Sequence, residues 1–421
     1  MHHRIIVGAL LFAASSARAD APVAEAPSVE DRLKKLQAQV DELSAAADAS
    51  DQAALKEPTF RLYGFIDMGL QKLWTNDLAA GSTGATFVLG NINLYFDFHP
   101  AEDWRSLVEV RFTNYPGDAT SETFDPANGT GDDLVRWSAI VIERAYIQWQ
   151  KHDSFGIRVG EFLTPYGIWN VDHGTPTLIA LARPEFVTKE MWPSHLLGVE
   201  AFGKLPDLLP GDWQLEYHAY VSNGRTAGVV DPTNDKTVGG HLIISTTQPH
   251  RMAFGVSFMD GTFDDTTGGF DLGTGMTNAP QHVAYREDGL ALDASIDVGN
   301  LRLRSELITR RLDYTTGEHA LTAVPGVYAA DSVEGDAYAL AAYRISGTRY
   351  EPFVYAEGYR VPTTEGDLQA TASAGLNIYF TPAIQLKLQY SHSRWYDIDG
   401  FGLTRQAASE DFLAAKLVMG I

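Results

Sequence analysis

The chain has 421 residues and no cysteine, so it can form no disulfide, no thiol nucleophile and no cysteine metal site. Acidic residues exceed basic ones, and with a formal net charge of −22 we expect no nucleic-acid partner. No apolar run approaches the roughly eighteen residues that a spanning helix needs, so a membrane form of the chain would have to cross as strands.

Residues 1–19 have the pattern of a secretory signal peptide. A positively charged start at positions 2–4 precedes an apolar run over 5–14, and Ala17-Arg18-Ala19 supplies an A-x-A cleavage site. The apolar run is too short to span a bilayer as a helix. We therefore predict that the chain is exported.

Residues 20–57 combine a spacer with a helical pattern. Apolar residues recur at alternating steps of four and three, which are the a and d positions of a heptad. They are Val29, Leu33, Leu36, Val40, Leu43 and Ala47. Pro58 ends the pattern, because proline disfavours helix in the residue before it. The repeat predicts a short coiled coil that joins three copies of the chain. The alternative is a solvated amphipathic helix.

From residue 58 to the C-terminus, short and long connections alternate. The short connections are 99–103, 151–154, 203–212, 245–250, 299–300, 346–349 and 381–383. The long connections are 75–85, 113–136, 163–195, 223–235, 260–281, 311–336, 361–370 and 392–410. They separate about sixteen strands, and one plain rim with one decorated rim is typical of a transmembrane, antiparallel, up-and-down β-barrel. We predict this all-β fold for residues 58–421.

The segments between these connections have a period of two residues. In 301–310, Leu301, Leu303 and Leu307 share one face, and the charged residues Arg302, Arg304, Glu306 and Arg310 share the other. A soluble β-sandwich would also alternate, but it would seldom reach so many strands in one uninterrupted meander. We therefore expect an apolar face toward lipid and a polar face toward the lumen.

Three strings of residues carry a family resemblance. They are Phe60-Arg61-Leu62-Tyr63-Gly64-Phe65-Ile66-Asp67, Arg144-Ala145-Tyr146-Ile147, and the run from Arg158 to Gly167. With the signal peptide and the heptads, the chain resembles the Gram-negative trimeric porins that carry an N-terminal coiled coil, such as the DcaP-like porins and the phosphate-selective porin O and P group. One departure is the last residue, Ile421, where porins usually have phenylalanine or tryptophan.

The resemblance implies that the connection after the fifth strand folds back into the lumen and narrows it. Here that connection is 163–195, the longest of all, and excursions of this length are usually functional or disordered. Its apolar run over 178–181 needs packing partners, which disfavours disorder. The alternatives are an exposed lid and a contact with a neighbouring subunit.

Charge placement on the inward faces bears on ion selectivity. The basic candidates are Arg61, Arg105, Arg111, Arg144, Arg158, Arg251, Arg302, Arg304, Arg310, Arg344, Lys387 and Lys416. The acidic candidates are fewer: Asp67, Asp97, Glu109, Glu200, Glu216, Asp293, Asp297 and Glu306. The two faces of 350–360 could not be distinguished. Because nearby charge outweighs screened, distant charge, this balance favours anions. The alternative is that the arginines pair with acids and only organise lumen water.

We predict that eleven side chains line or constrict the pore. They are Arg302, Arg304, Arg310, Arg111, Arg144, Arg158, Arg183, Lys189, His173, Glu109 and Asp293. Glu143 does not fit the pattern, since it falls on the face of Val141 and Ala145. Either a β-bulge resets the face at Glu143, or another subunit covers it.

No catalytic, metal or cofactor motif stands out. His173 and His195 lack a zinc-binding spacing, and the acidic loop around Asp264 lacks that of a calcium loop. We therefore expect no cofactor, no metal and no catalysis. The sequence favours a homotrimeric, passive diffusion channel for small hydrophilic solutes in the Gram-negative outer membrane, surrounded by lipid and lipopolysaccharide. The alternatives are a substrate-specific channel for an anionic or sugar-like solute, an outer-membrane barrel enzyme and a surface-binding barrel.

The heptad pattern makes the first testable prediction. Replacing Leu36 and Val40 with lysine places charge in the apolar seam, so the trimer should weaken while the β-sheet circular dichroism stays unchanged. Native gels and sedimentation measure the oligomer. An unaltered oligomer would show that the helix does not join the subunits.

Overall fold

The computed structural model describes residues 59–75, 84–113, 139–172, 174–206, 209–225, 235–267, 281–314, 331–360, 368–396 and 409–421. The predicted signal peptide and the predicted coiled coil lie outside these residues. Among the described residues, no helix is long and apolar enough to cross a membrane.

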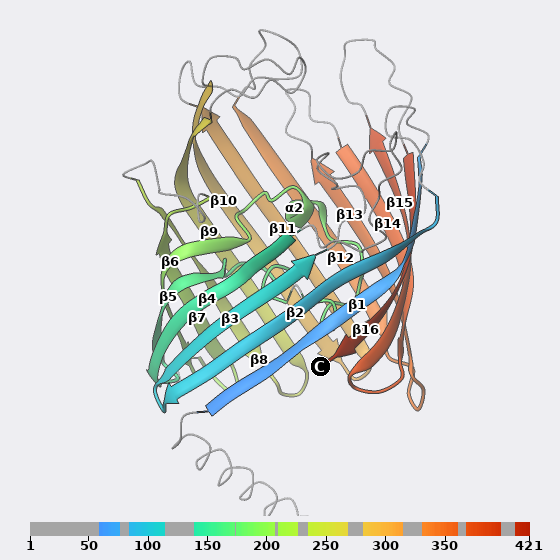
Figure 1. The fold of residues 1–421 in the computed structure, drawn as a ribbon, viewed down its shortest axis with the longest axis horizontal. Coiled ribbons are helices and arrows are strands. Elements are labelled where there is room, and N and C mark those ends of the chain that lie inside the picture. Colours follow the sequence, from blue (N-terminus) through green and yellow to red (C-terminus); the bar gives the residue numbers. More distant parts are fainter. Residues whose placement is uncertain are drawn as a thin grey trace, which may run out of the picture. The chain divides into compact units, whose positions relative to one another are not determined.

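Sixteen antiparallel strands form one closed barrel (Figure 1). Each strand pairs with its neighbours in sequence, and β1 closes the ring against β16. The strands are β1 (Thr59–Thr75), β2 (Thr86–Ala101), β3 (Trp104–Thr113), β4 (Ala139–His152), β5 (Phe155–Leu163), β6 (His195–Leu205), β7 (Gln214–Ser222), β8 (Thr237–Thr246), β9 (Arg251–Thr267), β10 (Gln281–Val298), β11 (Leu301–Tyr314), β12 (Ser332–Tyr343), β13 (Tyr350–Arg360), β14 (Leu368–Tyr379), β15 (Ile384–Tyr396) and β16 (Ser409–Gly420). The short helix α2 (Glu185–Thr188) lies between β5 and β6. The predicted fold class is confirmed.

Every predicted short connection joins two paired strands, but some strands run further than expected. β9 and β10 continue their ladder to Thr267 and Gln281, well into the predicted loop 260–281. β12 begins at Ser332, inside the predicted loop 311–336. Beyond the apolar belt both faces of a strand can be polar, so the alternation that marks the strand in the sequence disappears there.

The two faces of the wall differ as the two-residue period predicts. Leu290 and Leu307 are 48% and 42% exposed, and both belong to an outward set of large apolar side chains. On the opposite face of the same strands, Asp293 and Glu306 are buried. An exposed apolar face around a closed barrel suits a lipid environment, and a polar inner face suits a hydrated lumen.

A β-bulge accounts for Glu143. In the β3–β4 ladder, Glu109 pairs with Arg144 and Val110 pairs with Ile142, so Glu143 is skipped. Its carboxylate lies 2.7 Å from Arg111 and 2.8 Å from His195, and its side chain is buried. Of the two alternatives that the sequence left open, the structure supports the bulge.

Candidate functional site

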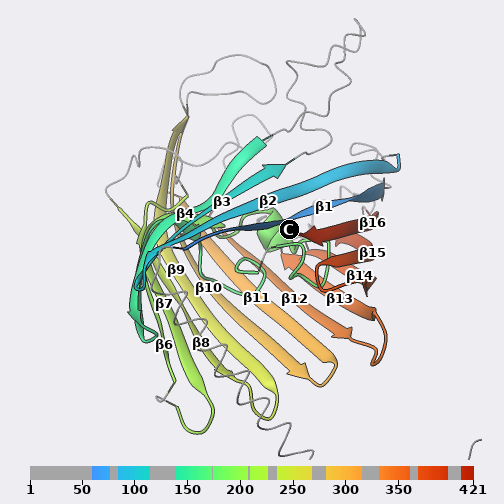
Figure 2. The same cartoon turned by 60° about the horizontal axis from the view of Figure 1, so that its bottom comes forward.

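The segment 164–194, here called the inner loop, lies inside the barrel. Figure 2 shows it with α2 within the ring of strands. Its groups form hydrogen bonds with inward-facing side chains of strands that are far from it in sequence, including Asp67 on β1, Glu306 on β11 and Gln389 on β15. The inner loop therefore folds into the lumen, as the resemblance implies.

Aromatic packing fixes the inner loop against β9–β13. Tyr166, Trp169, Phe186, Met191 and Trp192 of the loop are almost fully buried. They form one apolar cluster with residues of the wall, namely Met259, Ala291, Ile308, Tyr338, Leu340, Ala342, Phe353, Tyr355 and Tyr359. Burying each large side chain stabilises the arrangement by about 1.5–3 kcal/mol. The loop therefore has its own core against one side of the barrel.

Carboxylates of the wall bind the main chain of the inner loop. Glu306 accepts hydrogen bonds from the backbone N–H groups of Ile168 and Trp169, both at 2.8 Å, and from the hydroxyl of Tyr338 at 2.6 Å. Its side chain is 4% exposed. An unpaired N–H group inside the barrel would be costly, so these bonds determine the direction in which the loop enters the lumen.

Two further wall carboxylates bind the start of α2. The N–H of Glu185 donates to Glu357 at 2.5 Å, and the N–H of Phe186 donates to Asp336 at 2.7 Å. The first N–H groups of a helix have no acceptor within the helix. Glu357 and Asp336 supply the acceptors for the N–H groups of Glu185 and Phe186. Gln369 on β14 completes the contact by donating to the side chain of Glu185.

Side chains of β14 and β15 bind the middle of the inner loop through its main chain. Gln385 donates to the carbonyl of residue 176, the ammonium of Lys387 to that of residue 178, and Asn377 to that of residue 179. Gln389 accepts the N–H groups of residues 181 and 182 at 2.6 and 3.2 Å. These bonds hold the backbone of the stretch, while Ile179 and Ala180 are buried in the apolar cluster and Leu178 packs against it.

Arg225 binds the C-terminal end of the inner loop. Its guanidinium donates to the carbonyls of Glu190 and Met191 at 2.8 and 2.6 Å, and it forms hydrogen bonds with both carboxylate oxygens of Glu287 on β10. The indole of Trp192 donates to the carbonyl of Thr309 at 3.0 Å. The loop is thus bound to the wall from its first turn to its last.

Six of the seven predicted arginines lie on the inner wall, and each of these six is paired with an acid. The pairs are Arg111–Glu143 at 2.7 Å, Arg144–Glu109 at 2.6 Å, Arg158–Glu200 at 2.8 Å, Arg302–Glu351 at 3.3 Å, Arg304–Asp297 at 2.6 Å and Arg310–Glu334 at 2.6 Å. In most pairs the acid is the more deeply buried partner: Arg144 is 22% and Glu109 0% exposed, and Arg302 is 31% and Glu351 3% exposed. In five of the six pairs the cation is therefore more exposed than its acid; in Arg304–Asp297 the acid is more exposed, at 25% against 14%.

The other predicted residues are divided between wall and loop. Asp293 is buried on the inner wall, where its carboxylate lies 2.9 Å from His241. Arg183 and Lys189 belong to the exposed side of the inner loop, away from its apolar cluster. His173 lies outside the described residues. Among the described residues, no cluster of histidine, aspartate and glutamate could hold a metal ion.

Sequence reasoning missed several inward-facing acids, so the excess of basic side chains that it assigned to the wall is wrong. Glu334 and Asp336 fall in the predicted loop 311–336 but lie on β12, and Glu351 and Glu357 lie on β13, whose sequence does not distinguish its two faces. All four are buried. They partner Arg302, Arg310 and the main chain of the inner loop. The composition of the wall is therefore mixed rather than basic.

Asp172 is an acid of the inner loop that lies among arginines of the wall. The residue is exposed, yet the surrounding barrel partly desolvates its carboxyl group. This burial raises the pKa of Asp172, while the positive charges of Arg304, Arg251 and Arg302 act to lower it. Charges of opposite sign thus face each other from the loop and from the wall.

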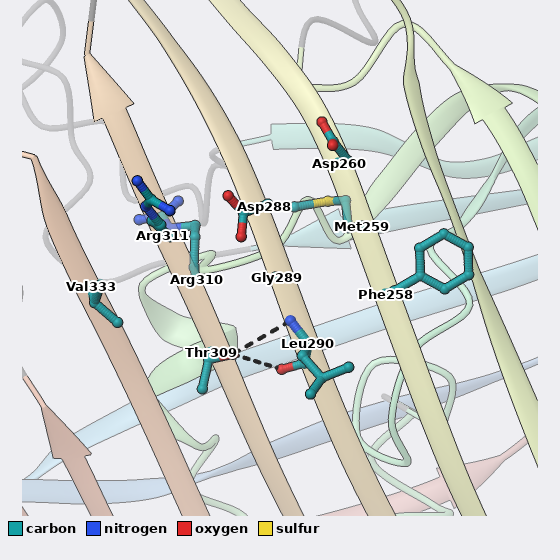
Figure 3. A pocket seen from close by; sticks show the side chains of 10 residues that line it. All are labelled: Phe258, Met259, Asp260, Asp288, Gly289, Leu290, Thr309, Arg310, Arg311 and Val333. Carbon is teal, nitrogen blue, oxygen red and sulfur yellow. Dashed lines mark hydrogen bonds between the residues drawn. The ribbon is translucent and has the colours of Figure 1, made fainter.

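A hollow of about 420 Å³ lies on the outward side of the wall, over β9–β12 (Figure 3). Its lining joins the exposed apolar side chains of Phe258, Leu290 and Val333 to the charged side chains of Asp260 and Arg311. This is the composition of the boundary between an apolar belt and a polar rim. The hollow therefore belongs to the outer surface and not to the lumen.

No protein-family model and no curated protein matches the chain. Solved structures do. The anion-selective porin of Comamonas acidovorans has a TM-score of 0.56 at 12% identity, over 87% of this chain and all of that one. The outer membrane channel DcaP of Acinetobacter baumannii gives 0.55 at 12%, over 87% and 98%, and OmpT, an outer membrane protein of Vibrio cholerae, gives 0.54 at 11%, over 86% and 100%. At these identities the likeness establishes a shared barrel fold.

Gly167 offers a direct test of the bonds to Glu306. Its φ is +59°, and a Cβ built there would collide with a carboxylate oxygen of Glu306. Gly167→Ala should therefore destabilise the barrel by about 1–3 kcal/mol in urea unfolding. Gly174→Ala is the matched control, since its Cβ would make only ordinary contacts, the nearest at 3.6 Å, and it should change stability by less than about 0.5 kcal/mol. Equal effects of the two variants would contradict the assigned geometry.

Proposed function

We propose that the protein is a porin, which is a passive diffusion channel of the Gram-negative outer membrane. The inner loop narrows this channel, and the pore is narrowest beside it. The observation that carries the proposal is the binding of the loop across the lumen by Glu306, Asp336, Glu357 and Gln389. An enclosed apolar cluster excludes water on one side of the loop, so solutes pass on its exposed side. No catalytic step is needed for this function.

We further propose that the protein acts as a homotrimer and that its partners are membrane lipid, lipopolysaccharide and small hydrophilic solutes. The outward apolar face supports the lipid environment. The heptad pattern of residues 29–47 supports trimer formation through a coiled coil. The similar structures include a porin, an outer membrane channel and an outer membrane protein in a trimer form, which supports this assignment.

A substrate-specific channel is the second candidate, and the arginines of β4 and β5 favour it. The guanidinium of Arg158 lies 4.4 Å from the ring centre of Tyr146, and that of Arg144 lies 5.4 Å from the ring of Tyr95. Stacked and ion-paired arginines are rigid donors that suit anionic or hydroxylated solutes. Saturation of the current by one solute, but not by others of its size, would favour this candidate.

Removing residues 176–184 tests the narrow section. The deletion should raise the single-channel conductance in planar bilayers, because the narrowest section dominates the resistance of a pore. Deleting residues 49–57, which are equally many and precede the first strand, is the control and should leave conductance unchanged. Both proteins are first checked for β-sheet circular dichroism. If the loop deletion folds and conducts like the unaltered protein, the loop does not limit the current.

The Arg304–Asp297 pair tests whether charges on the inner wall set the ion selectivity of the pore. Arg304→Gln leaves the carboxylate of Asp297 unbalanced, so the reversal potential in a potassium chloride gradient should move toward cations. Adding Asp297→Asn should return most of the shift. The effect should shrink between about 0.1 M and about 1 M salt, where the Debye length falls from about 10 Å to about 3 Å. No difference among the three proteins would assign selectivity to the external loops.

A further inference from the structure

The wall of the barrel has a gap beside β4. This strand pairs with β3 as far as Ala139, but its ladder with β5 ends at Ala145 and Glu161. β5 itself ends at Leu163, where the chain leaves the wall to form the inner loop. In the part of the chain that the structure describes, residues 140–142 of β4 therefore have no strand on their β5 side.

A side-chain contact crosses part of this gap. The carboxylate of Glu143 on β4 lies 2.8 Å from His195, the first residue of β6. Further along β4, Ile142 pairs with Val110, the neighbour of the inward-facing Arg111, so Ile142 faces outward. Its side chain is 50% exposed. The gap is thus bordered by an apolar side chain on its outer side.

The gap lies within the apolar belt. Trp149 and Phe155, whose ring centres are 6.4 Å apart, mark one edge of this belt. At about 3.3 Å per residue and a strand tilt of about 40°, Ile142 lies about 18 Å from Trp149 along the membrane normal, in a belt about 25 Å tall. The open side of β4 would therefore face hydrocarbon, which offers no hydrogen-bond partner to a backbone group.

Glu161 places a carboxylate on the outward face beside the gap. Arg158 and Phe162 of β5 face inward, where Arg158 pairs with Glu200 and Phe162 is fully buried, so Glu161 faces outward. It has intermediate exposure and no ion pair with another described residue. By the same geometry it lies about 15 Å from Phe155 along the membrane normal. A carboxylate at this depth is costly in contact with lipid.

The opposite side of the barrel differs in both respects. The ladders that join β9, β10 and β11 run without a break. Val256, Leu292 and Leu307 on the outward face of these strands are apolar and exposed. This side of the wall suits contact with lipid chains.

We propose that the outward face of β4 and β5 around Glu161 is the surface by which the barrel contacts a second copy of the chain. A protein surface can supply hydrogen bonds to the open side of β4 and to the carboxylate, whereas lipid chains cannot. A second copy is the occupant because the heptads of residues 29–47 would keep barrels of this chain at a high local concentration. This surface rests on the homotrimer proposed above and adds which face of the barrel takes part.

Photo-crosslinking tests the surface. The photoreactive residue p-benzoylphenylalanine is placed singly at Ile142 or at Leu292 of the full chain in outer membranes. The two side chains are 50% and 47% exposed, so Leu292 on β10 is a matched control. Irradiation should join two copies of the chain at Ile142, and it should give no such product at Leu292.

Charge reversal at Glu161 is the second test. Glu161→Lys places an unmatched positive charge in the contact, so the dissociation constant of the purified oligomer should rise about tenfold or more. Asp288→Lys is the control, because Asp288 is also an outward carboxylate of intermediate exposure but lies on β10. Sedimentation measures the oligomer, and circular dichroism verifies that both barrels fold.

Three results would overturn this surface: products between copies at Leu292 instead of Ile142, products of Ile142 with lipid or within one chain alone, or equal weakening by the two charge reversals. An oligomer of the unaltered protein that gives any of them would retain the homotrimer and lose this surface. A monomeric unaltered protein would remove both. Conductance in planar bilayers, measured separately, decides the porin assignment.

Discussion

A polypeptide segment that crosses the interior of a barrel must find partners for its backbone groups, and here buried side chains of the wall supply them. Glu306, Asp336 and Glu357 accept backbone N–H groups at two places along the inner loop, residues 168–169 and the start of α2. Each unpaired group would otherwise lower stability by about 1–3 kcal/mol. These bonds and the apolar cluster around Phe186 and Trp192 together determine which part of the lumen is filled.

The acids of the inner wall consequently have different partners on different strands. On β3–β6 the carboxylates lie beneath arginines, as in Arg144–Glu109 and Arg158–Glu200. On β12 and β13 Asp336 and Glu357 face the inner loop instead. Solutes on the exposed side of the loop therefore meet guanidinium groups whose counter-charges lie deeper. A wall of mixed composition can in this way present mainly hydrogen-bond donors to the lumen.

The barrel could be predicted from the sequence because lipid and water impose opposite requirements on alternate residues, as Leu307 and Glu306 show. The alternation of apolar and polar residues no longer identifies a strand where the strand leaves the apolar belt. Glu334 and Asp336 lie in the inner rows of a strand that extends beyond the apolar belt, and the bulge at Glu143 shifts the period by one. The bonds between Glu306 and residues 168 and 169 join positions distant in sequence and leave no local signal.

Hydrogen exchange of individual backbone amides tests the central claim most directly. If wall carboxylates bind the inner loop, the N–H groups of Ile168, Trp169, Glu185 and Phe186 should exchange about a hundredfold or more slowly than in an unfolded peptide of the same sequence. Exchange of these four amides at the rate of the unfolded peptide, in a barrel whose strand amides are protected, would contradict the account.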